Sequence, residues 1–138
     1  MTSRKKPEIL FLCVHNAGRS QMAAGFARSL GDGRVVIHSA GTAPGEQLNP
    51  SVVEVMHEKS IDITSQFPQA LTEEMGLGSD VIITMGCGDT CPVYPGKRYL
   101  DWEIADPEGK SLDEVRPIRD DIERRVAALL DELLDQTN

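Results

Sequence analysis

Short apolar runs occur along the chain at intervals typical of buried strands. Glu8-Ile-Leu-Phe-Leu-Cys13 is apolar after its first residue and leads into a glycine-containing loop, a pattern that favours a buried strand of a parallel sheet. Two further runs have the same character, and one shorter segment is a candidate fourth strand: Arg34–His38, Asp80–Thr84 and Arg98–Asp101.

The segments between these runs carry helix signals. Ala and Met are dense after Ser20, and Asn49-Pro50 supplies an N-cap followed by a proline at the first helical position. The expected helices are Ser20–Leu30, which stops at Gly31, a helix from Asn49-Pro50 to about Lys59, and a short helix around Leu71–Met75 with Thr72 as a candidate cap.

The C-terminal segment predicts a long amphipathic helix. It opens with Ser111-Leu-Asp-Glu114, which has the spacing of a capping box. Apolar residues then recur at steps of three and four along one face: Ile118, Ile122, Val126, Leu130 and Leu133. Pro117 lies beyond the first turn, so a kink or break is expected near Arg116.

Strands that alternate with helices predict one α/β domain over residues 1–138, with a mostly parallel sheet and a flexible tail at residues 1–7. In such sheets ligands bind beyond the carboxyl ends of the strands. The first strand ends at Cys13, which places this cysteine at the expected ligand edge.

Charge and cysteine content narrow the function. The net charge of −8 argues against general binding to nucleic acid or to anionic membranes, which requires a basic face. No apolar run reaches the roughly 18 residues of a membrane-spanning helix. Three scattered cysteines do not form a secreted disulfide framework and suit a reducing compartment, so a cytoplasmic location is expected.

The segment Cys13-Val-His-Asn-Ala-Gly-Arg-Ser20 carries the strongest chemical signal. A loop that curls into a helix N-terminus points successive N–H groups inward and forms a nest for an anion. Arg19 adds a planar fork for two oxyanion oxygens, and the same positive surroundings favour the thiolate of Cys13. The predicted oxyanion-binding residues are Val14, His15, Asn16, Ala17, Gly18, Arg19 and Ser20.

Other interpretations of this loop stay open on the residues alone. Cys13 could be a buried structural cysteine that an unrelated arginine follows. A nucleotide-binding P-loop is excluded, because its Gly-Lys-Ser/Thr ending is missing. Histidine spacing favours no metal site, and none is expected.

The motifs occur in a recognisable order: Cys13-x5-Arg19-Ser20, Ser39-Ala-Gly41 and Asp106-Pro107. On these motifs the chain resembles the low-molecular-weight protein tyrosine phosphatases, and more specifically the arsenate reductases built on that fold. Ser20-Gln-Met-Ala23, Asn49-Pro50 and Arg116-x2-Arg119-Asp120 agree with the reductases, and the likeness extends from Ile9 to Leu134. The resemblance implies a four-stranded parallel sheet with helices on both faces.

A general acid must protonate the oxygen that leaves the substrate. Asp106 precedes Pro107 and is therefore biased toward an extended backbone, but Asp101, Glu103 and Glu108 are equal candidates on the residues alone. The resemblance selects Asp106. In the phosphatases of this fold an aromatic residue follows Asp-Pro, whereas Glu108 follows it here. This difference weakens the expectation of an aryl phosphate as the substrate.

Cys87 and Cys91 follow the third strand. The resemblance implies an arsenate reductase in which Cys13 attacks arsenate, Cys87 attacks Cys13, and Cys91 attacks Cys87, with thioredoxin reducing the final disulfide. No bound cofactor is expected beyond this external thiol reductant. From the residues alone, these two cysteines could also be small buried apolar residues or a metal site, although Cys-x3-Cys without a partner is weak for zinc.

Three alternative functions remain at this stage. One is an arsenate reductase that uses mycothiol or glutathione. The second is a low-molecular-weight protein tyrosine phosphatase, and weak phosphatase activity is expected even of a reductase. The third is a non-catalytic module that binds oxyanions or senses redox state.

Overall fold

The computed structural model describes residues 6–86 and 92–135. Four strands form one parallel sheet in the order β2-β1-β3-β4, which confirms the predicted sheet. The strands are β1 (Glu8–Cys13), β2 (Val36–Gly41), β3 (Val81–Thr84) and β4 (Arg98–Asp101). Because β2 and β3 pair with opposite sides of β1, the carboxyl end of β1 lies where the strand order reverses, which is the usual ligand position in open parallel sheets.

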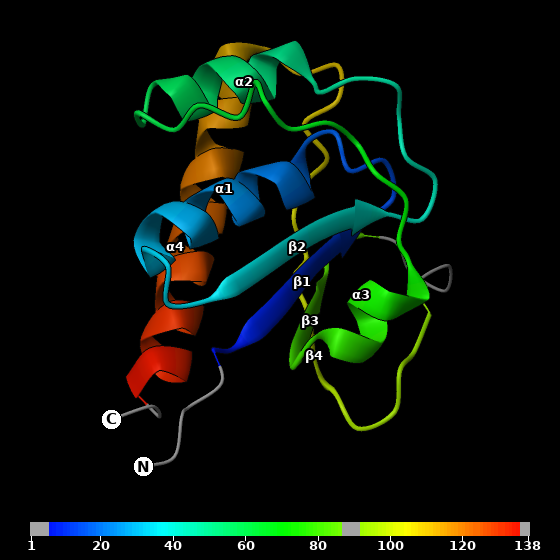
Figure 1. The fold of residues 1–138 in the computed structure, drawn as a ribbon. Helices are drawn as coiled ribbons and strands as arrows, with labels where there is room; N and C mark the ends of the chain where they lie inside the picture. Colours follow the sequence, from blue (N-terminus) through cyan, green and yellow to red (C-terminus); the bar gives the residue numbers. More distant parts are fainter. Residues whose placement is uncertain (1–5, 87–91, 136–138) are drawn as a thin grey trace.

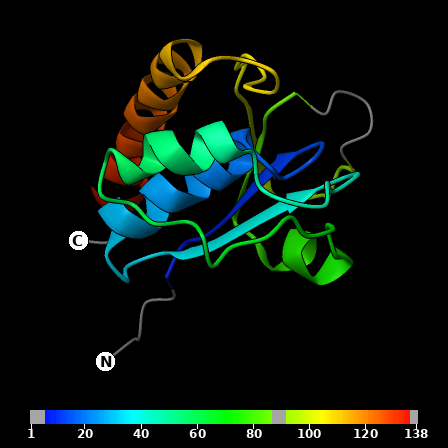
Figure 2. The same cartoon turned by 90° about the horizontal axis from the view of Figure 1, so that it is seen from above.

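Helices cover both faces of this sheet, as predicted. The helices of the described residues are α1 (Arg19–Gly31), α2 (Pro50–His57), α3 (Glu73–Gly78) and α4 (Leu112–Asp135). Figures 1 and 2 show α1, α2 and α4 on one side of the strands and the short α3 on the other. Alternate residues of β1 accordingly enter two separate cores. Ile9, Phe11 and Cys13 pack in the larger core, and Leu10 and Leu12 pack in the smaller one.

The predicted caps of α2 and α3 are confirmed. The Asn49 side chain accepts a hydrogen bond from the Ser51 N–H at 2.9 Å, and the Thr72 hydroxyl accepts one from the Met75 N–H at 3.2 Å. The bounds differ slightly from expectation, because α2 ends at His57 and α3 is displaced to Glu73–Gly78.

The prediction for β2 is wrong at both ends, since the strand spans Val36–Gly41 and not Arg34–His38. The Arg34 N–H and guanidinium bond the Gly31 carbonyl, so this residue closes the end of α1. At the other end, Ser39 and Ala40 are buried and pair with Phe11 and Leu12. Small residues carry too little hydrophobic signal to reveal this half of the strand.

Helix α4 begins with the predicted capping box, in which Ser111 and Glu114 exchange backbone-to-side-chain hydrogen bonds. The expected break near Arg116 is wrong, because the helix runs through Pro117 to Asp135. Pro117 and Asp113, whose carbonyl loses its usual N–H partner, are both exposed, so water can hydrate that carbonyl near the helix start. Within the described residues, no helix has the length and apolar character needed to cross a membrane.

Glu58 ties the end of α2 to α4. Its carboxylate accepts hydrogen bonds from Arg116 at 2.7 Å and from Arg119 at 2.7 Å, and Arg119 also donates to the Val55 carbonyl. The hydrogen bonds from the two arginines lower the pKa of Glu58 from 4.5 to about 2. This contact joins the carboxyl end of α2 to α4.

A pH series tests this link. Since the folded chain lowers the pKa of Glu58, the interaction stabilises the fold above about pH 4.5 and is lost as the pH falls toward 2. We expect the Tm of the wild type to fall more steeply over this range than that of Glu58→Gln, followed by circular dichroism. Glu123→Gln, which removes a carboxylate paired with Lys59 alone, is the control. Parallel Tm curves for wild type and Glu58→Gln would contradict the prediction.

Candidate active site

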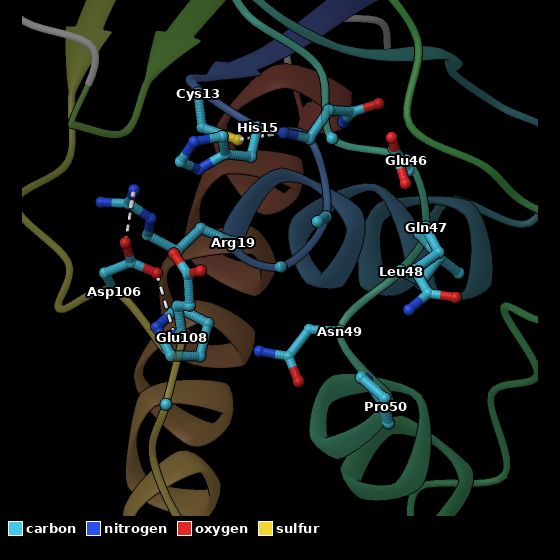
Figure 3. Close-up of a pocket in the computed structure, with 16 residues that line it drawn as sticks. Cys13, His15, Arg19, Glu46, Gln47, Leu48, Asn49, Pro50, Asp106 and Glu108 are labelled. Carbon is cyan, nitrogen blue, oxygen red and sulfur yellow. Dashed lines mark hydrogen bonds and ion pairs between the residues drawn. The ribbon is translucent and has the colours of Figure 1, made fainter.

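A cavity of about 460 Å³ opens at the carboxyl end of β1. Three segments line it: the loop at residues 13 and 15–19, residues 45–50 before and at the start of α2, and residues 106–109. Figure 3 shows Arg19 and Asp106 on one side of this cavity and Asn49 and Pro50 on another. The structure therefore brings the predicted nucleophile, arginine and acid into one cavity.

The loop after Cys13 is held with its carbonyl groups turned outward. These carbonyls accept hydrogen bonds of 2.8–3.1 Å from backbone N–H groups of the next segment: Cys13 from Thr42, Val14 from Ala43, His15 from Gly45, and Ala17 from Asn49. In a trans peptide the C=O and the following N–H point in opposite directions. The amides of residues 14, 15, 16 and 18 are therefore directed inward, and the Asn16 N–H donates to Cys13 Sγ at 3.2 Å.

Helix α1 adds its positive end to this nest. The helix begins at Arg19, and its N-cap residue Gly18 supplies no side-chain hydrogen bond. The first amides of α1 are consequently available to a ligand, and the helix dipole favours negative charge at this point. Inward amides and a helix start together favour a small anion at this point, although the chain as a whole carries a net charge of −8.

Cys13 is only 2% exposed, and its sulfur lies at the base of the loop. It lies 2.8 Å from Ser20 Oγ, which in turn accepts a hydrogen bond from Asn16 Nδ2 at 2.7 Å. Asn16 adopts the left-handed conformation, with φ of 53°, that its side chain tolerates better than most. The Ser20 hydroxyl and the Asn16 backbone N–H can thus both donate to Cys13 Sγ, and two such hydrogen bonds stabilise a thiolate.

Arg19 lies across the cavity with a largely buried guanidinium. Its Nη1 donates to the Ile104 carbonyl at 3.3 Å, and its Nη2 lies 3.8 Å from Asp106 Oδ2. Gly86 packs directly on it, because a Cβ on this residue would lie 2.3 Å from Arg19 Nη1. Gly86 has a φ of +90°, so both space and conformation favour glycine beside the guanidinium.

The structure separates the four candidate acids. Asp106 and Glu108 line the cavity of Cys13, whereas Asp101 and Glu103 line a different cavity beside β4. Asp106 Oδ1 accepts the Glu108 N–H at 3.0 Å, which leaves Oδ2 facing Arg19. A Cβ on Gly18 would lie 2.8 Å from the Pro107 ring, so the glycine allows this acidic loop to approach the nest.

The three histidines and the two other cysteines of the sequence are placed as follows. His15 is exposed at the cavity wall, His38 pairs with Glu8 at 3.0 Å, and His57 ends α2. Cys87 and Cys91 lie outside the described residues. Among residues 6–86 and 92–135, no group of three His, Cys, Asp or Glu side chains is placed to hold a metal ion.

Sequence reasoning missed two parts of the site. Residues 45–48, which form one wall of the cavity, lack regular structure and have no motif that would identify them. Gln21 was quoted only within a motif, yet its amide contacts Asn16 at two points. A polar amide directly before the apolar run Met22–Ala24 is the one signal that could have drawn attention to it.

Comparison with known proteins identifies the family. The model for low molecular weight phosphotyrosine protein phosphatase matches residues 8–138, nearly the whole chain. The chain belongs to this family.

Relatives within this family are named as reductases. A protein of Halobacterium salinarum, named provisionally as an arsenate reductase, is 40% identical over 88% of this chain and 89% of its own length. The glutaredoxin arsenate reductase of Synechocystis is 33% identical over 89% of this chain and 95% of its own length. The structure of a thioredoxin-dependent arsenate reductase of Corynebacterium glutamicum matches with a TM-score of 0.86 and 39% identity. That match covers 98% of this chain but 65% of the other.

The contact between Gly86 and Arg19 predicts a selective loss of oxyanion binding. In Gly86→Ala the new methyl group displaces the guanidinium, and we expect phosphate affinity to fall by about tenfold or more, the effect of one charge-assisted hydrogen bond. Affinity is measured as phosphate protection of Cys13 against iodoacetamide, with Cys87 and Cys91 replaced by serine.

Gly96→Ala is the matched control. Gly96 has a similar φ of +81°, but a Cβ there has nothing within 4 Å. Both variants therefore carry the same kind of backbone strain, and only Gly86→Ala touches Arg19. Equal phosphate affinities in the two variants would refute the proposed role of this contact.

Proposed function

We propose that this protein is an arsenate reductase in which Cys13 is the nucleophile. The observation that carries the proposal is the position of its sulfur, beneath inward-facing amides and between two hydrogen-bonding groups, with Arg19 and Asp106 in the same cavity. The arsenate reductase names of the relatives support the substrate. The three cysteines of the chain support a reaction that transfers two electrons from sulfur.

In the first step, the Cys13 thiolate attacks arsenic and hydroxide leaves as the S–As bond forms. The loop amides and the Arg19 guanidinium bind the remaining oxygens, where they offset the negative charge that develops. Asp106 donates the proton that turns the leaving hydroxide into water. Its side chain is about half exposed and faces Arg19, so it can exchange protons with solvent between turnovers.

In the second step, the Cys87 thiolate attacks Cys13 Sγ. The S–As bond breaks and its electron pair remains on arsenic, which leaves as arsenite, while a Cys13–Cys87 disulfide forms. Cys91 then attacks Cys87, frees the Cys13 thiolate and forms a Cys87–Cys91 disulfide. A reduced dithiol, for which we propose thioredoxin, is oxidised as it reduces this disulfide.

One contact of the described residues supports the entry of Cys87. Gly86, to which Cys87 is bonded, lines the cavity beside β4 and lies against the guanidinium of Arg19, a residue of the Cys13 cavity. This proximity favours an attack from within the chain over one that depends only on a free small thiol.

A phosphatase is the second candidate, because the first step would be the same on a phosphate ester. Within the described residues, no Phe, Tyr or Trp lines the cavity, and Glu108 follows Asp106-Pro107 where an aryl group would emerge. These walls do not favour an aryl phosphate, so weak phosphatase activity is what we expect. Glutathione or mycothiol in place of thioredoxin remains the alternative for the reductant.

Cysteine substitutions test the relay. We expect Cys13→Ser to abolish arsenite release, and Cys87→Ser and Cys91→Ser each to lower thioredoxin-coupled turnover at least a hundredfold. In each variant, no other thiolate of the relay can take the place of the one removed. Arsenite formation is measured with thioredoxin and, separately, with glutathione or mycothiol. The reductase proposal is falsified if Cys87→Ser and Cys91→Ser both leave every arsenate-dependent activity unchanged. Turnover by a small thiol in the absence of both cysteines would support the alternative reductant.

Asp106→Asn tests the general acid. The amide keeps the shape of the side chain and cannot donate a carboxylic proton, so the first step should slow by about a hundredfold, within the usual range for such catalysis. Phosphate protection of Cys13 should remain, since the nest and Arg19 are intact. Glu108→Gln is the control in the same cavity. A larger loss in Glu108→Gln than in Asp106→Asn would assign the acid to Glu108.

A further inference from the structure

Gln21 is a buried polar residue in the first turn of α1. The residue is 1% exposed. Three oxygens nevertheless converge on its amide nitrogen: Nε2 donates to the Asn16 carbonyl at 3.1 Å, to Asn16 Oδ1 at 3.2 Å and to the Phe67 carbonyl at 3.3 Å. The nitrogen therefore joins the loop after Cys13 to the segment around Phe67.

The other end of the same amide is unmatched. Gln21 Oε1 is buried and, within the part of the chain that the structure describes, has no hydrogen-bond partner. A buried acceptor without a partner destabilises a fold, so an apolar side chain of similar size would avoid this cost. Stability of the core alone therefore does not explain a glutamine at this position. The hydrogen bonds that Gln21 Nε2 donates do explain it.

Two hydrogen-bond donors fix the side-chain oxygen of Asn16. Asn16 Oδ1 receives Gln21 Nε2 and also the backbone N–H of Gln69, at 3.0 Å. Because Oδ1 and Nδ2 lie at opposite ends of one planar amide, two donors at Oδ1 turn Nδ2 toward Ser20. Ser20 Oγ then accepts from Asn16, and its single hydrogen remains for Cys13 Sγ.

We infer that Gln21 is a positioning residue for the nucleophile. It fixes the orientation of the Asn16 side chain and, through Ser20, the hydrogen bond that stabilises the Cys13 thiolate. It also holds the Asn16 backbone, whose N–H is the second donor to Cys13. The inference depends on Cys13 as the reactive thiol, and it does not depend on arsenate as the substrate.

The test is the thiolate fraction of Cys13 in Gln21→Met. Methionine has nearly the same length and shape but donates no hydrogen bond. All proteins carry Cys87→Ser and Cys91→Ser, so that Cys13 is the single thiol. The alkylation ratio is the rate of reaction with iodoacetamide one pH unit below the midpoint of the parent protein's rate profile, divided by each protein's own plateau rate at alkaline pH. We expect this ratio to fall by about three- to tenfold, as for one weakened hydrogen bond to a charged atom.

Gln69→Met is the matched control. It removes a side-chain amide that donates to the Ser39 carbonyl at 2.8 Å, and it keeps the Gln69 backbone N–H that bonds Asn16. We expect the alkylation ratio of this variant to equal that of the parent protein within twofold. The charged and titratable groups around the cavity are the same in every protein compared: His15, Arg19, Glu46, Asp106 and Glu108.

Gln21→Leu is the second variant, in case Gln21→Met does not fold. Its side chain donates no hydrogen bond and adds no charge, so the alkylation ratio should again fall. Ultraviolet thiolate absorbance, taken as the difference from a Cys13→Ser protein, gives an independent reading of the same quantity. Folded Gln21 variants whose ratio matches the parent, or a Gln69→Met protein with an equal loss, would overturn the inference.

The outcome is separable from that of the proposed function. Alkylation and absorbance report on Cys13 without arsenate, thioredoxin or the other cysteines. If arsenate reduction fails while Gln21→Met still lowers the alkylation ratio, the positioning role stands and the substrate assignment falls. The reverse result would retain the reductase and remove Gln21 from its machinery.

Discussion

The structure depends on one constraint, the outward bonding of the carbonyl groups in the loop after β1. These groups accept hydrogen bonds from the N–H groups of residues 42, 43, 45 and 49, which directs the following amides inward, and the Asn16 N–H reaches Cys13 Sγ. The hydrogen bonds to this second segment therefore hold the loop in the conformation that directs its N–H groups inward. The adjacent parallel strands β1 and β2 supply this segment, since their carboxyl ends, at Cys13 and Gly41, lie side by side and release both segments at one edge of the sheet.

The anion site is therefore built from dipoles more than from net charge. The chain is strongly acidic, and Glu46, Asp106 and Glu108 line the same cavity as the nest. Inward amides, the start of α1 and one guanidinium must favour an anion against this background, which they can do only at short range. Acidic walls around a local positive floor suit a small oxyanion that enters the loop fully, and they disfavour an anion that stays at the rim.

Sequence reasoning succeeded where one residue type leaves little choice. The first strand was predicted with its observed bounds because its residues are apolar up to Cys13, and the caps at Asn49 and Thr72 were predicted because few residues fill that position. It failed at Ser39 and Ala40, whose pairing with β1 comes from tertiary contacts. Residues alone could not choose Asp106 from four acids, because the distance from Asp106 to Arg19 is set by the path of the chain after β4.

The loop serves a phosphatase and a reductase equally well in the first step, so the difference between them must lie in what attacks next. A phosphatase needs water at the bond between sulfur and phosphorus, and a reductase needs a thiolate at the sulfur itself. In this chain Gly86, the residue before Cys87, packs against Arg19, which lines the Cys13 cavity. In the proposed reaction, the side chain that binds the oxyanion therefore also contacts the residue directly before the second thiol.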